Sequence, residues 1–107
     1  MTAGYDATPF RVSVVRSGDR AVVRLAGELD CASAPELERA LGDLLAAKPP
    51  TIVVVEAERL TFSDVVGAGL LIDTADRLAP RGQLLVRDAS RQLARVLTLL
   101  ERADLLG

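Results

Sequence analysis

Few side chains in this sequence could take part in catalysis, and the residue types that it lacks exclude most known kinds of active site. The chain of 107 residues has no histidine and a single cysteine, Cys31. Without histidine, the commonest general base and metal ligand are absent, and neither a Cys–His nor a Ser–His–Asp nucleophile can be assembled. Gly67-Ala68-Gly69 lacks the spacing, and the following Lys-Ser/Thr, of a phosphate-binding loop. We therefore expect a protein that is not an enzyme and that uses neither a metal nor a cofactor.

The polar residues left for a functional role include Asp30, Cys31, Ser63 and Asp64. Asp64 fits a helix N-cap and also an acid that contacts a partner, and the two roles are compatible. Ser63 is the hydroxyl beside it; we regard it as a weak candidate for phosphorylation and favour a turn serine. For Cys31 we favour a small apolar filler near a helix over a redox switch.

Composition and charge limit the class of partner. Half of the residues are hydrophobic but only 3% are aromatic, so the core must be aliphatic. The formal net charge is −2 with both signs interspersed, which gives no electrostatic case for nucleic acid. No apolar run is long enough to cross a bilayer, and the N-terminus has no signal-peptide pattern. We predict a cytoplasmic protein with no direct membrane insertion and no internal disulfide.

Four strands are expected to position these residues. We predict a flexible arm over residues 1–9 and a single domain over residues 10–107. Alternating apolar residues predict a strand over 10–14 and a second over 21–26, which together form an antiparallel hairpin. The unbroken apolar runs 52–55 and 83–86 predict buried strands, the first of them central and covered on both sides, or on one side with an edge partner.

Three helices are expected between and after these strands. Ser33 and Glu36 fit a capping box for the first, Asp64 caps the second and Ser90 opens the third. Their predicted inner faces are Leu37, Ala40, Leu41, Leu44 and Leu45; Gly67, Leu70, Leu71, Thr74, Ala75 and Leu78; and Leu93, Val96, Leu97 and Leu100. The order β-β-α-β-α-β-α predicts an α/β domain whose mixed, mostly parallel sheet has helices packed against it.

Two motifs, in this order and at this separation, resemble the STAS family, the domains of sulfate transporters and anti-sigma-factor antagonists. The first is Gly27-Glu28-Leu29-Asp30, followed by the helix start at Ser33. The second is the segment from Val55 to Leu71, whose part from Leu60 onward is similar to the family's Phe-x-Asp-Ser-Ser/Thr-Gly-Leu before a helix. The resemblance covers most of the predicted domain and implies a STAS-like fold.

The resemblance also implies a function in bacterial signalling and transcription regulation. Antagonists of this kind bind an anti-sigma factor, a serine kinase with a GHKL-type ATPase fold, and are released when the serine after the helix-start Asp is phosphorylated. In this sequence Val65 and Val66 follow Asp64, so the usual hydroxyl is absent and no phosphorylation is expected there. The residues expected to form the partner-binding face are Asp30, Cys31, Ser33, Ser63, Asp64, Val65, Val66, Gly67 and Gly69.

Within this face we expect Val65 to stay partly exposed, Val66 to turn inward, and Gly67 and Gly69 to let the helix pack closely on the sheet. The lost serine leaves several alternatives open. The protein could be a constitutive binder, an antagonist with another input such as the Cys31 thiol, or a STAS subunit that grips the ATPase of an ABC-type lipid transport complex. A small-ligand sensor and a homodimer also stay open.

Overall fold

The alternating residues after Phe10 form the predicted hairpin. The computed structural model describes residues 9–46 and 48–107, so the predicted arm lies outside the described residues except for Pro9. Strand β1 (Arg11–Ser17) pairs antiparallel with β2 (Arg20–Leu29). Gly18 makes the tight turn between them with a φ of 61°, a conformation that glycine adopts without steric cost.

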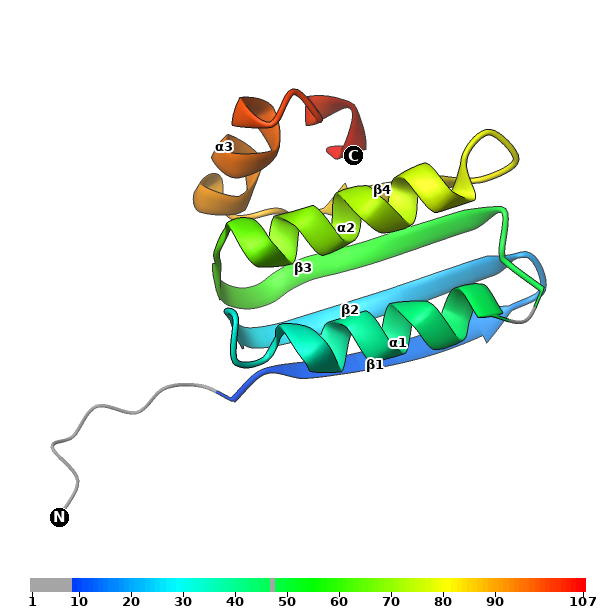
Figure 1. Cartoon of the computed structure of the whole chain (residues 1–107), viewed down its shortest axis with the longest axis horizontal. Helices are drawn as coiled ribbons and strands as arrows, with labels where there is room; N and C mark the ends of the chain where they lie inside the picture. The colour runs from blue at the N-terminus through cyan, green and yellow to red at the C-terminus, as the bar shows by residue number, and fades with distance from the viewer. Residues whose placement is uncertain (1–8, 47) are drawn as a thin grey trace, which may run out of the picture.

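The predicted element order is confirmed, and it produces a four-stranded mixed sheet (Figure 1). Strands β3 (Ile52–Ser63) and β4 (Gln83–Arg87) complete the order β1-β2-β3-β4, in which β2, β3 and β4 run parallel. Helix α1 (Ala34–Ala46) connects β2 to β3, and α2 (Val65–Leu78) connects β3 to β4. Helix α3 (Arg91–Leu99) and the short 3-10 helix η1 (Ala103–Leu105) follow.

Strands β2 and β3 continue well past their predicted ends at residues 26 and 55. Their pairing absorbs two register shifts, one between Arg24 and Ala26 and one between Gly27 and Glu28. Such irregularities let a strand bend and re-aim its side chains without ending. The charged stretch after Val55 therefore remains in the strand, with Ala57 buried and Glu58 exposed. Because of this extension, β2 ends directly before Asp30 and β3 ends directly before Asp64.

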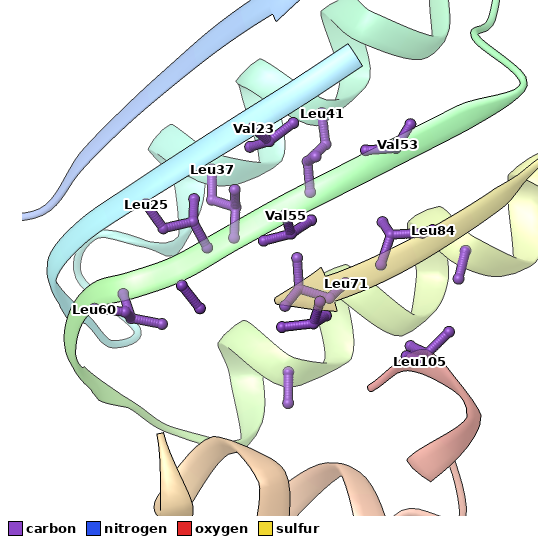
Figure 2. Packing of buried hydrophobic residues seen from close by; sticks show 14 of the residues in the cluster. Val23, Leu25, Leu37, Leu41, Val53, Val55, Leu60, Leu71, Leu84 and Leu105 are labelled. Atoms are coloured by element: carbon purple, nitrogen blue, oxygen red, sulfur yellow. The ribbon is translucent and has the colours of Figure 1, made fainter. Parts of the chain in front are cut away.

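The hydrophobic core occupies one face of the sheet, under α1 and α2 (Figure 2). Alternate strand residues point into it, and the buried stripes of both helices pack against them. Its labelled members in Figure 2 are Val23, Leu25, Leu37, Leu41, Val53, Val55, Leu60, Leu71, Leu84 and Leu105. Leu93 and Leu97 of α3 join the same cluster, whereas Leu100, predicted on this inner face, is exposed because the helix ends at Leu99.

Candidate functional site

The two motifs meet where β2 and β3 end. Leu29 and Ser63 are partners in the parallel register, and the backbone N–H of Asp64 donates to the carbonyl oxygen of Leu29 at 3.2 Å. The loops that begin with Asp30 and Asp64 are therefore neighbours. The carboxyl ends of adjacent parallel strands are a common place for a site, because loops from separate parts of the chain converge there.

Asp30 organises the first loop by accepting hydrogen bonds from the backbone N–H groups of that loop. Its Oδ1 accepts hydrogen bonds from the N–H groups of Ala32 and Ser33, at 3.0 Å each, and its carbonyl oxygen accepts from Ala34 N–H at 2.8 Å. The Ser33 N–H, followed by the Ser33 hydroxyl, lowers the pKa of the Asp30 carboxyl below its ordinary value. Asp30 is thus an ionised group turned toward the loop that it shapes.

Ser33 ties this loop back to β2, and the predicted capping box is wrong. Its hydroxyl accepts from Asp30 N–H and donates to the Glu28 carbonyl oxygen, both at 3.0 Å. The N–H of Glu36 reaches the backbone oxygen of Ser33 at 3.0 Å. The physical reason is competition: the Asp30 carboxylate takes the free N–H groups of the turn, and the hydroxyl serves the strand end.

Asp64 is the N-cap of α2, as predicted. Its backbone is extended, with φ −96° and ψ −174°, and its Oδ1 accepts from the N–H groups of Val66 at 3.0 Å and Gly67 at 3.2 Å. These bonds satisfy two of the backbone donors that every helix leaves free at its start. Capping fixes the direction in which the next side chains point.

The two valines after Asp64 are both exposed, Val65 by 61% and Val66 by 46%. The expectation for Val65 is confirmed, whereas the expectation that Val66 turns inward is wrong. The buried stripe of α2 starts at Gly67 and Ala68, and successive helical residues are rotated by about 100°, which leaves Val66 beside this stripe. An exposed apolar pair therefore directly follows the N-cap of α2.

Gly67 and Gly69 play different roles. A Cβ atom at Gly67 would lie 2.5 Å from Cδ2 of Leu29 and 3.0 Å from Oγ of Ser63, so glycine is needed for this approach. A Cβ atom at Gly69 would meet nothing within 4 Å, and the packing role predicted for Gly69 is wrong. Gly67 thereby seats the start of α2 directly on the end of β2.

Ser63 lies beneath the surface of the site. It is buried, its hydroxyl donates to the Asp64 carbonyl oxygen at 3.3 Å, and its N–H donates to Oε1 of Gln92 at 3.4 Å. Burial disfavours both phosphorylation of Ser63 and a direct contact with a partner. The Gln92 contact, which brings the start of α3 to the site, was not predicted, because nothing distinguishes this glutamine in sequence from any other polar helix residue.

Cys31 is exposed in the first loop, so its interpretation as a small apolar filler near a helix is wrong. Cys31 lies at the same end of the domain as Val65 and Val66, because the Leu29–Ser63 pairing brings the two segments together, and a redox role stays the alternative. Among residues 9–46 and 48–107, no three side chains of His, Cys, Asp or Glu gather in a way that could hold a metal ion. Within the same ranges, every helix is too short or too polar to span a membrane.

Comparison with known proteins identifies the family. The STAS domain family model matches residues 11–106, and the chain belongs to this family. No curated protein sequence matches significantly. An anti-sigma factor antagonist from Mycobacterium paratuberculosis is similar in structure, with a TM-score of 0.81, 24% identity, and coverage of 92% of this chain and 84% of that one.

Two further solved structures extend the comparison. The anti-sigma factor antagonist SpoIIAA in its unphosphorylated form has a TM-score of 0.78 and 23% identity, with 92% of this chain and 86% of that one covered. The STAS domain of a SulP transporter from Vibrio cholerae has a TM-score of 0.55 and 21% identity, with 87% and 72% covered. At these identities the likeness shows the fold, so the chain has the STAS fold of antagonists and of transporter domains.

Proposed function

We propose that the chain is a non-catalytic, antagonist-type STAS domain that binds a GHKL-type anti-sigma factor kinase and is not switched off by phosphate at the usual helix position. The docking surface, as we define it, comprises Cys31, Asp64, Val65 and Val66. One observation carries the proposal: the N-cap of α2 is intact, yet the two residues after it are exposed valines. The capped helix start is retained and the reactive hydroxyls are lost.

An apolar docking surface suits binding without a switch. Burying a fully exposed valine contributes about 1.5 kcal/mol or more, so the two half-exposed valines together would contribute roughly 2 kcal/mol. That corresponds to about thirtyfold in affinity. A phosphate at this place would add a charge of about −2 to an interface built from apolar contacts. With no hydroxyl at 65 or 66, this route to dissociation is closed.

The partner can be identified through Cys31, because the chain has no other thiol. A photo-crosslinker attached there in cells of the native organism should capture a GHKL-type kinase, identified by mass spectrometry. The matched control is a Cys31→Ser, Ser13→Cys double variant, which moves the crosslinker to exposed Ser13 on β1. If Cys31 selectively captured the ATPase of an ABC transporter, the kinase proposal would be wrong and the transport alternative favoured.

Whether the kinase can phosphorylate the chain can be tested with the captured kinase and ATP. The wild-type chain should accept no phosphate, whereas Val65→Ser should accept it, because that change restores a hydroxyl one residue after the N-cap. Leu99→Ser, at an exposed position near the end of α3, should stay unmodified. Stoichiometric phosphate on the wild-type chain would overturn the proposal. Val65→Asp, which places a negative charge on the docking surface, should weaken binding of the kinase by about tenfold or more.

A further inference from the structure

The two edge strands of the sheet differ in whether another segment of the chain pairs with their outer side. At the β4 edge, Leu106 forms a parallel bridge with Val86, and the N–H of Gly107 donates to the Val86 carbonyl oxygen at 2.9 Å. At the other edge, β1 pairs with β2 alone, and no described residue pairs with its outer side. Exposed edge strands are templates for pairing with another chain, and proteins usually cover or interrupt them.

Strand β1 carries no proline, glycine or lysine, and its exposed valines lie on both faces of the sheet. Val14 belongs to the core face, because its partner Val23 is buried, yet Val14 itself is 39% exposed. Val15, on the opposite face, is 54% exposed. The apolar face of the sheet therefore extends to this edge, where the side chain of Val14 is left partly exposed.

A shallow hollow of about 360 Å³ continues the exposed core row between β1 and α1. Its lining is mostly apolar, from Val14, Ala40 and Leu44, with Arg16 and Asp43 at its border. Arg16 is already engaged, because its guanidinium donates to the Lys48 carbonyl oxygen. The edge thus offers free backbone groups and an apolar row, and the Arg16 guanidinium, which keeps its charge, donates to a backbone carbonyl oxygen.

We infer that a second copy of this chain occupies the edge, with β1 pairing antiparallel to β1 of that copy across a two-fold axis. Full overlap of a seven-residue strand with itself has one solution, in which Val14 lies opposite Val14 of the second copy. Arg11 then lies opposite Ser17, and Arg16 opposite Val12. No like charges are directly opposed, a condition that cross-strand pairing requires.

This pairing keeps the helices of both copies on one side of a continuous eight-stranded sheet, because paired residues share a face. It also places the two docking surfaces at opposite ends, so the inference does not depend on the proposed function. A single edge pairing buries far less than the roughly 800 Å² per partner of standard interfaces. The dimer is therefore weak and concentration-dependent, and main-chain hydrogen bonds between the two β1 strands supply most of its affinity.

The test uses sedimentation equilibrium of the full chain from about 1 µM to about 1 mM, a range that brackets weak association. The wild-type average mass should rise toward twice the monomer mass. Because position 14 faces its own copy, V14E and V14K should each weaken self-association by about tenfold or more through like-charge contact. An equimolar mixture of V14E and V14K should restore the dimer as a heterodimer.

The mixture also controls for folding, since rescue requires that both variants be folded. V65E makes the same change at a more exposed valine, 61% against 39% for Val14, on the docking surface and should leave the dimer unchanged. Three results would overturn the inference: a wild-type chain that stays monomeric throughout, a dimer that both charged variants leave intact, or a dimer lost in both variants without rescue in the mixture. Loss of the dimer in V65E would assign it to the docking surface instead.

Discussion

Replacing Gly67 by alanine tests how tightly α2 is seated on the sheet. The added Cβ atom would lie 2.5 Å from Cδ2 and 2.7 Å from Cγ of Leu29, distances that require a shift of one of the groups. Leu29 is fully buried, so its side chain has little room to move. We expect the start of α2 to be pushed away from the end of β2.

The magnitude follows from two opposing effects. Glycine to alanine within a helix gains about 1 kcal/mol of helix propensity. Overpacking a well-packed core costs about 1–3 kcal/mol. Gly69→Ala is the matched control, because it lies in the same helix and its Cβ atom meets nothing within 4 Å. The free energy of unfolding should therefore be about 1–3 kcal/mol lower for Gly67→Ala than for Gly69→Ala.

Urea unfolding followed by circular dichroism measures both variants, since the chain has no tryptophan to report by fluorescence. Gly69→Ala should be as stable as the wild type or more stable, and Gly67→Ala should unfold at lower urea with an unchanged m-value. If the two variants agreed within about 0.5 kcal/mol, steric contact with Leu29 would not be what requires glycine.

Three further predictions concern the caps and the core. Asp64→Ala should lower the free energy of unfolding by about 1 kcal/mol in urea titrations, with Asp64→Asn largely retaining the cap; equal losses would deny the capping role. The pKa of Asp30 is lowered in the folded state, so its negative charge stabilises the fold at pH values above the unfolded pKa of about 3.9. This stabilisation is lost as the pH falls through the pKa that Asp30 has in the folded state. Asp30→Asn should thus be less stable than the wild type at neutral pH and converge with it in acid, and a gap independent of pH would contradict this. Leu71→Ala, in the core, should cost about 2–5 kcal/mol, against under about 0.5 for exposed Leu99→Ala, and similar losses would place Leu71 outside the core.

The fold was predictable from the sequence because its signals are local. The valine-rich strands and the caps at Asp64 and Ser90 each act within a few residues. What local pattern could not predict was pairing between distant residues. The extension of β3 depends on register shifts against β2, and the cover of the β4 edge depends on a bridge between Val86 and Leu106.

The proximity of the two motifs was predicted correctly, and the exposure of their side chains was predicted less well. Asp30 and Asp64 were expected together, and the Leu29–Ser63 pairing brings them together. Exposure depends on the angle at which a helix meets the sheet, so Val66 and Gly69 could not be placed from periodicity alone. The capping box predicted for Ser33 and Glu36 was wrong for a related reason. A serine at a helix start can reach several backbone groups, and the tertiary structure determines which of them it bonds.

The hydrogen bonds of Asp30, Ser33 and Asp64 also bear on how fast and how tightly a partner can bind. These bonds hold both loops in one conformation before any encounter, so the entropy of ordering them is already spent in folding. Association should then proceed as rigid-body docking, with little change of backbone between free and bound states. Differences in affinity among variants of Val65 and Val66 should accordingly appear mainly in the dissociation rate.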